Sequence, residues 1–412
     1  MKSASIFFFA VCFLFSATVQ SQDRFFTVTS KDSINGIPRF QSSLGANMKL
    51  NGYFDVFGGL QDNETFNVGL ISVFGDDDEK SFQMDLYQTQ IKFDTYYALD
   101  DGQVIKAVVE FDFWGGDGRM RLRKAYIETK HWQIGQNWNN FGDEVLWPNI
   151  MEWEGPPSGV WIRSPHLKYM NSLSNQNWNY TLSLEAPITD YLNYDDLEPL
   201  VEDARQVTPD FTSSIQHKKG WGHIRLAGIL RYIRYKLNDE IDGFVGYGFS
   251  LSGKYTKNKG IFQYQLVGGK GITAYMTSVA GLGYDGYPTT RGDFNATPAY
   301  GGWATYEYFI TKKLHTNVVF GYTQFNLEDM ERFILATDIS PDLIHFDGNV
   351  RNYHYYGIVN LMYDPYKRMT FGLELDYGVK HFNYSGLINN INVSENRSRD
   401  AMRISFGFMF YF

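Results

Sequence analysis

The chain has 412 residues, of which 43% are hydrophobic and 20% are charged, and its formal net charge is −9. A negative balance argues against a nucleic-acid partner, because phosphates bind to a basic surface. The only cysteine, Cys12, lies in an amino-terminal stretch that we expect to be removed, which excludes thiol catalysis, disulfides and cysteine-ligated metals in the mature protein.

The amino terminus has the pattern of a secretory signal peptide. Lys2 supplies a basic start, and the apolar run at 6–15 is too short to cross a bilayer as a helix. We therefore predict a signal peptide over residues 1–21, a short amino-terminal periplasmic segment over 22–46, and one main domain over 47–412.

The composition of this main domain favours β-structure in a membrane. Aromatic residues make up 17% of the chain, with 29 Tyr and 33 Phe, and there are 39 Gly. No later apolar run reaches the roughly 18 residues of a transmembrane helix, yet many segments alternate apolar and polar residues. Because only helices and closed barrels satisfy every backbone polar group in lipid, we predict an all-β, transmembrane antiparallel barrel. The alternative is a soluble, secreted β-sandwich.

The alternation is clear in the segment 104–114. Glu110 and Asp112 share one face with Lys106, whereas apolar residues occupy the other face. Since an Arg or Lys facing lipid at mid-membrane costs about 2–4 kcal/mol, the charged face is predicted to line a water-filled lumen. The last segment alternates in the same way and ends on Phe412, which is the usual signal for barrel-assembly machinery.

Sixteen segments show this pattern, with boundaries at about 47–58, 84–98, 103–114, 119–129, 131–137, 160–171, 176–186, 211–218, 221–237, 243–257, 261–276, 299–311, 314–326, 349–363, 368–382 and 399–412. Short turns and long loops alternate between them, as expected when every second connection faces the periplasm. Long outer loops are expected at 327–348 and 383–398, among others.

The outer loop from Trp138 to Gly159 is the candidate constriction. It is rich in Trp and Pro, and basic residues lie on both sides of it. On the predicted strand 119–129, alternation places Met120, Leu122 and Tyr126 on the lipid face and the arginines in the lumen. The candidate pore-lining and constriction residues are Arg119, Arg121, Arg123, Glu110, Asp112, Arg163, His166, Lys168, Asp143, Glu144, Glu152 and Glu154.

Two interpretations of this set remain open. In the first, the loop folds into the barrel, and its acids face the arginines across the lumen, which would select small polar or anionic solutes by size and charge. In the second, the arginines pair with Glu110, Asp112 and the loop acids and only stiffen the wall. A second basic set, His223, Arg225 and Arg231, is also predicted to face the lumen.

Catalytic and metal-binding patterns are missing from the sequence. The eight His show neither H-x-H nor H-x-x-x-H spacing, and no G-x-S-x-G nucleophile motif occurs. We therefore expect no cofactor, no metal site and no enzymatic activity.

An ordered set of motifs between about 52 and 170 resembles the DcaP-like porin family of outer-membrane channels. The motifs are Gly52-Tyr53-Phe54-Asp55, Val109-Glu110-Phe111-Asp112-Phe113-Trp114, Arg121-Leu122-Arg123-Lys124-Ala125-Tyr126, Gly135-Gln136-Asn137-Trp138-Asn139-Asn140-Phe141, Glu154-Gly155-Pro156-Pro157 and Arg163-Ser164-Pro165-His166-Leu167-Lys168-Tyr169.

The resemblance implies a sixteen-stranded, trimeric porin that favours small anionic solutes such as dicarboxylates. It implies pore-wall roles for Arg121 and Arg123, and basic positions beside the constriction for Arg163 and Lys168. The chain departs from the family at Lys124, where members often carry His. Residues 22–46 are also too short for the periplasmic coiled coil of some relatives.

These observations predict a passive diffusion channel in the bacterial outer membrane. Its expected partners are small anionic or polar solutes, outer-membrane lipid, the barrel-assembly machinery through Phe412, and two further copies in a homotrimer. The alternative is a structural or adhesin barrel with a blocked lumen and partner-binding loops.

Overall fold

The structure is a computed structural model, and it describes residues 25–60, 65–74, 80–173, 177–189, 201–237, 239–335 and 344–412. The predicted signal peptide, 1–21, lies outside the described residues. Within them, no helix is long and apolar enough to cross a membrane.

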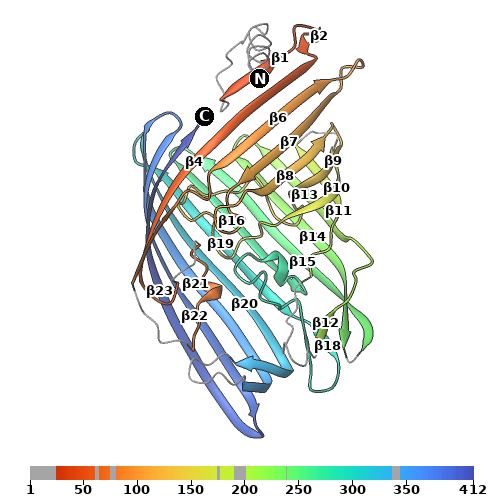
Figure 1. Ribbon diagram of the computed structural model, residues 1–412, viewed down its shortest axis with the longest axis vertical. Helices are drawn as coiled ribbons and strands as arrows, with labels where there is room; N and C mark the ends of the chain where they lie inside the picture. Colours follow the sequence, from red (N-terminus) through yellow and green to blue (C-terminus); the bar gives the residue numbers. More distant parts are fainter. Residues whose placement is uncertain are drawn as a thin grey trace, which may run out of the picture.

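The described residues form a closed antiparallel β-barrel with sixteen wall positions, which confirms the predicted fold class (Figure 1). β5 and β6 pair with successive parts of β4 and together fill one position. The wall strands are β4 (Phe40–Phe57), β5 (Ser81–Asp85), β6 (Gln90–Ala98), β7 (Val104–Asp112), β8 (Arg121–Glu128), β9 (Trp132–Trp138), β10 (Arg163–Ser172), β11 (Trp178–Glu185), β13 (Asp210–Lys219), β14 (Gly222–Leu237), β15 (Glu240–Lys257), β16 (Gly260–Lys270), β19 (Pro298–Phe309), β20 (Leu314–Leu335), β21 (Ile344–Tyr366), β22 (Met369–Ile388) and β23 (Ile391–Tyr411).

Several short elements accompany the wall. They are β1 (Phe26–Thr29), β2 (Ser33–Ile34), β3 (Ile37–Pro38), β12 (Val201–Asp203), β17 (Gly286–Pro288), β18 (Phe294–Ala296) and the 3₁₀ helices η1 (Val68–Leu70) and η2 (Thr273–Tyr275). The barrel closes where β23 pairs with β4. The first wall strand begins at Phe40 rather than at residue 47.

The two ends of the barrel differ. At one end, the turn end, short connections join the strands, and both β1, the first described strand, and the carboxyl terminus lie there (upper end in Figure 1). At the other, the loop end, β20 to β23 extend far beyond the other strands. The sequence predicted loops at 327–348 and 383–398. This was wrong for most of 327–348, because β20 continues to Leu335 and β21 begins at Ile344. It was also wrong for 383–398, since β22 and β23 continue to a tight turn at Asn389 and Asn390, both with positive φ as a type I′ hairpin requires.

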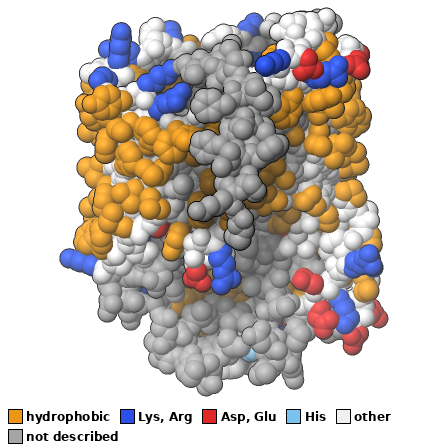
Figure 2. All heavy atoms as spheres, turned by 45° about the horizontal axis from the view of Figure 1, so that its top comes forward, with side chains coloured by type: hydrophobic (Ala, Val, Ile, Leu, Met, Phe, Trp, Pro, Cys, Tyr) orange, Lys and Arg blue, Asp and Glu red, His pale blue; other side chains and the backbone are white. Residues whose placement is uncertain are grey.

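Side chains alternate between lipid and lumen as the sequence predicted. On β14, His223, Arg225 and Arg231 are buried inside the barrel, whereas Leu226 and Leu230 are exposed on the outer face. Figure 2 shows a broad band of hydrophobic side chains around the visible face, with Lys and Arg side chains along its upper rim. The band is the surface that contacts the hydrocarbon of a membrane.

One β-bulge changes the alternation on β8. Glu110 of β7 pairs with Lys124, but the next residue, Phe111, pairs with Leu122, so Arg123 is an additional residue on β8. An inserted residue reverses the faces of the residues that follow it. Tyr126 consequently lies opposite buried Val108 and faces the lumen, and its predicted lipid-facing position was wrong.

The strand expected over 261–276 also differs, because it ends at Lys270. Gly271 adopts a φ of +65°, and the chain turns inward there. The apolar residues that follow, including Tyr275 and Met276, are fully buried inside the barrel. Apolar residues continue past the strand because the lumen at the loop end is itself apolar.

The outward band predicts a depth-dependent cost for charge. Leu226→Arg should lower the free energy of unfolding by about 2–4 kcal/mol, because the guanidinium would face hydrocarbon within the exposed apolar run from Ile224 to Leu230. Urea unfolding in lipid vesicles measures this change. Gly220→Arg, in a turn with open space around its Cα, should be nearly neutral; equal losses in both variants would contradict the assignment of the band.

Candidate pore wall and constriction

Residues 139–162, between β9 and β10, form the constriction loop, which folds into the barrel. Its first part is held by β14 and β15. Arg225 donates to the Asn140 carbonyl and side-chain oxygens, and Ser252 Oγ donates to Asp143 Oδ2 at 2.7 Å. His223 Nε2 lies 2.8 Å from the same Asp143 oxygen. These contacts direct the loop along the inner wall instead of into the medium.

Neighbouring side chains favour the ionised form of the Asp143 carboxylate in this contact. Burial alone would raise the pKa of Asp143, but the hydrogen bond from His223 and the nearby charge of Arg225 hold that pKa below its ordinary value. A carboxylate that accepts charged hydrogen bonds is a strong anchor.

The middle of the loop is held by polar residues of three more strands. Asn149 Nδ2 donates to Glu307 Oε1 of β19 at 2.8 Å. The Asn149 carbonyl accepts from Asn317 of β20 at 2.7 Å and from Asn360 of β21 at 2.9 Å. The wall side chains therefore satisfy loop groups that would otherwise be buried without partners.

The tip of the loop continues past β21 and reaches β22 and β4. Glu374 accepts the N–H groups of Met151 at 2.8 Å and of Glu152 at 2.7 Å. Lys49 donates to the Met151 carbonyl at 2.7 Å. Glu152 in turn accepts the N–H of Phe66, at 2.7 Å, from a second inward segment. The tip is thus held between an acidic and a basic residue of the wall.

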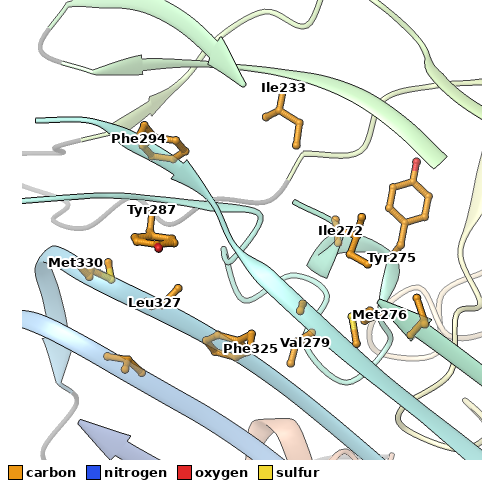
Figure 3. Close-up of a cluster of buried hydrophobic side chains, with 14 of the residues drawn as sticks. Ile233, Ile272, Tyr275, Met276, Val279, Tyr287, Phe294, Phe325, Leu327 and Met330 are labelled. Atoms are coloured by element: carbon orange, nitrogen blue, oxygen red, sulfur yellow. The ribbon is translucent and has the colours of Figure 1, made fainter. Parts of the chain in front are cut away.

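Two other inward segments fill the lumen at the loop end. Segment 65–74 contains η1 and packs its buried side chains against Ile150 of the constriction loop. Segment 271–297 contains η2, β17 and β18 and belongs to a large apolar cluster with inward residues of β14 and β20. Figure 3 shows the centre of this cluster, including Ile233, Tyr275, Met276, Val279, Phe294, Phe325 and Leu327.

The predicted basic ladder lies on β8, next to the acids of β7. Arg121 makes a two-pronged contact with Asp112, at 3.0 and 2.7 Å. Arg123 bridges both acids, with 2.8 Å to Glu110 and 2.8 Å to Asp112, and Lys124 lies 3.1 Å from Glu110. These contacts of Arg121 and Arg123 with the wall acids are the ones expected under the second interpretation, in which the arginines pair with acids and stiffen the wall.

Exposure is unequal within these pairs. The side chain of Asp112 is 0% exposed and that of Glu110 is 6% exposed, but Arg121 is 34% and Lys124 is 20% exposed. Arg123 is buried under Trp153 of the constriction loop, with its guanidinium carbon 4.5 Å from the ring centroid. Within this cluster, the partly exposed side chains are therefore cations, and the acids that they contact are buried behind them.

The remaining candidates are dispersed around this wall. Arg119 lies in the exposed turn before β8, and Arg163 stacks on Trp138 with 4.7 Å between guanidinium carbon and ring centroid. His166 and Lys168 are buried on β10. His166 contacts Gln133 at 2.9 Å, and Lys168 donates to the Trp138 carbonyl at 3.0 Å.

The loop acids contact other parts of the molecule than the ladder. Asp143 meets His223 and Ser252, Glu144 lies 3.5 Å from Asn137 Nδ2, and Glu152 accepts from Phe66. The loop reaches the ladder through an aromatic ring, Trp153. Trp153 also stacks on Trp114, and Glu154 donates its N–H to Glu152.

Sequence reasoning missed the wall residues that hold the loop. Gln263, Glu307 and Glu374 all lie on lumenal faces and accept loop N–H or amide groups. A signal was available, since each is a polar residue at a lumen position of a predicted strand, but it did not indicate which segment would contact them. Among the described residues, no three metal-binding side chains converge.

Comparison with known proteins supports this architecture. No family model and no curated protein matches the chain. Among solved structures, the outer membrane channel DcaP of Acinetobacter baumannii is similar, with a TM-score of 0.66 and 15% identity over 89% of this chain and 97% of that chain. An anion-selective porin from Comamonas acidovorans has a TM-score of 0.56 and 8% identity, over 90% of this chain and 100% of that one. OmpT of Vibrio cholerae has a TM-score of 0.51 and 10% identity, over 93% and 100%. At these identities, the similarity shows a shared porin barrel fold.

The clamp at the loop tip can be tested with Glu374→Gln. The amide keeps one acceptor and presents an N–H₂ group to a backbone N–H, so the tip should detach, since hydrogen bonds to a charged group contribute roughly 1.5–3 kcal/mol each. We expect a larger and noisier single-channel conductance and new protease cleavage within 139–162. Glu240→Gln, on the exposed part of β15, serves as the control; identical traces for both variants would argue against the clamp.

Proposed function

We propose that the protein is an outer-membrane porin, a passive diffusion channel for small polar solutes that prefers anions such as dicarboxylates. The observation that carries this proposal is the unequal exposure on β7 and β8, where cations face the lumen and their carboxylate partners are buried. Transport of this kind needs no cofactor and no catalytic group.

The charge arrangement favours anions for an electrostatic reason. In a narrow, partly desolvated passage, a solute interacts mainly with the nearest charged surface, because water screens that surface poorly there. Arg121 and Lys124 supply this surface. An anion that exchanges its hydration shell for these donors loses little free energy when it enters, whereas a cation is repelled.

Dicarboxylates fit the same wall. A guanidinium presents paired N–H donors that match a carboxylate. Arg121 and Lys124 stand on either side of buried Arg123, so a solute with two carboxylates can contact one cation with each end. The resemblance to the DcaP-like family and the fold shared with an anion-selective porin support this preference.

The location and assembly proposed for the chain follow from its outer surface. The hydrophobic band suits a bilayer, and the short connections at the turn end suit the periplasmic side. Phe412 and Ala46 exchange backbone hydrogen bonds at 2.9 and 3.0 Å, which places the terminal residue at the closing seam, where assembly machinery would bind it. We propose a homotrimer, as the similar OmpT of Vibrio cholerae also has a trimer form.

A structural or adhesin barrel is the second candidate. The apolar cluster around segment 271–297 favours it, because an apolar filling at the loop end narrows the path for water. A liposome-swelling assay with sugars and dicarboxylates separates the two functions. Solute flux supports the porin, and a complete lack of flux in a folded preparation supports the structural barrel.

The selectivity is tested with Arg121→Ala/Lys124→Ala. Removing the two exposed cations should lower the anion-to-cation permeability ratio by about threefold or more, since the buried acids would then dominate the local field. Reversal potentials across a planar bilayer under a salt gradient give this ratio. Lys236→Ala/Arg291→Ala removes the same charge at the loop end, away from β8, and should change the ratio little. An unchanged ratio in the β8 variant would leave the ladder a purely structural role.

A further inference from the structure

The turn end of the barrel is strongly basic along four consecutive connections. These connections, 218–222, 257–260, 310–313 and 364–369, join β13 to β14, β15 to β16, β19 to β20 and β21 to β22. The residues are the rim cations: Lys218, Lys219, Lys257, Lys259, Lys312, Lys313, Lys367 and Arg368. The one acid in these connections, Asp364, already accepts from Thr370 at 2.6 Å and lies 3.3 Å from His315 Nε2.

Four of the rim cations surround a surface pocket of about 640 Å³, rim pocket A, between the last two of these turns. Lys313 donates to the Pro365 carbonyl at 2.7 Å and so ties the two turns together. Lys312 and Lys367 are exposed at its edge, and Tyr366 is 71% exposed. The pocket is lined by these four cations, of which Arg368 is the fourth, by the acid Asp364, and by Pro365, Tyr366, Met369, Thr370 and Tyr411.

A second pocket of about 420 Å³, rim pocket B, repeats this composition at the turn between β15 and β16. Lys257 and Lys259 lie at the turn, and the exposed rings of four aromatic residues lie beside them. These rings belong to Tyr255, Phe262, Tyr306 and Tyr308.

Rim pocket B opens to the outer face of the barrel, because its rings Tyr306 and Tyr308 are exposed and Glu307 between them is buried in the lumen. Rim pocket A lies at the tips of its turns. Its Met369 shares the outer face of exposed Phe371, whereas its Asp364 contacts buried His315 on the lumenal side. The pockets therefore adjoin the hydrophobic band and lie where its aromatic edge meets the polar rim. This is the depth at which lipid head groups lie beside a membrane barrel.

We propose that rim pockets A and B bind the head groups of anionic phospholipids in the periplasmic leaflet. The cations contact the phosphate, and the exposed aromatic rings pack against the glycerol and the first methylenes of the acyl chains. Two features identify this ligand: the pairing of several cations with exposed rings at both sites, and the direct continuity of each pocket with the lipid-facing band. The proposal rests on the proposed membrane location.

The test measures lipid retention by the full chain. Protein extracted in mild detergent is mixed with equal amounts of phosphatidylglycerol and phosphatidylcholine, and bound lipids are counted by native mass spectrometry. The wild type should retain phosphatidylglycerol over phosphatidylcholine by about tenfold. Lys312→Gln/Lys367→Gln and Lys257→Gln/Lys259→Gln should each lose the lipid bound by one pocket, and the combined variant should lose most of this preference.

The matched control is Lys218→Gln/Lys219→Gln, which removes two rim cations that line neither pocket. It should keep the preference. Equal loss in the control and pocket variants would show that rim charge alone attracts the lipid, and this result overturns the proposal. Equal retention of both lipids by the wild type, or retention of soluble peptidoglycan fragments in place of phosphatidylglycerol, also overturns it.

Heat-modifiable migration on gels confirms that each variant is folded, and conductance is measured on the same samples. A variant that conducts like the wild type but has lost its lipid preference supports the pockets. A folded wild type that selects phosphatidylglycerol but passes no ions contradicts the proposed porin function and leaves the lipid sites intact. The two failures are therefore distinguishable.

Discussion

Closure of the backbone hydrogen-bond ladder is the constraint on which the rest of the structure depends. In lipid, an unpaired strand edge leaves a row of N–H and C=O groups without partners. β23 removes the edge by pairing with β4 from Met402 opposite Phe57 to Tyr411 opposite Asn47. Beyond that point, β1 continues along the same edge of β4, from Gln41 to Leu44. In the closed wall, apolar side chains face outward to the lipid, and the side chains of the other face line the lumen.

Much of the lumen is filled by segments of the chain that fold inward. The constriction loop, segment 65–74 and segment 271–297 enter the lumen, and their backbone groups need partners there. The wall supplies them with carboxylates and amides such as Glu374 and Asn360, whereas the loop end supplies an apolar surface around Phe325 and Tyr275. The lumen therefore combines two environments. A polar zone positions the constriction loop. An apolar zone holds segment 271–297, together with a buried ion pair between Asp285 of that segment and Arg231 of β14.

The electrostatic character of the passage follows from burial more than from composition. The chain as a whole is acidic, with a formal net charge of −9. On β7 and β8, however, the carboxylates of Glu110 and Asp112 lie behind the cations they neutralise. The same principle applies at the turn end, where Asp364 is engaged by Thr370 while Lys312 and Lys367 remain exposed. Both surfaces present cations to their surroundings although the protein is anionic overall.

The sequence by itself determined the barrel, its strand order and the face of most wall residues. The reason is that apolar and polar residues alternate with a period of two along each strand, so that one face suits lipid and the other suits water. It also indicated the loop between β9 and β10, whose neighbours carry clustered charge. Tertiary structure decided the rest. The bulge at Arg123 placed Tyr126 inside, and the apolar lumen turned the chain inward after Lys270, where alternation predicted more strand. The contacts of Glu374, Glu307 and Gln263 with the loop depend on residues more than a hundred positions apart. Local periodicity reports which side of a wall a residue faces, but not which distant segment will meet it there.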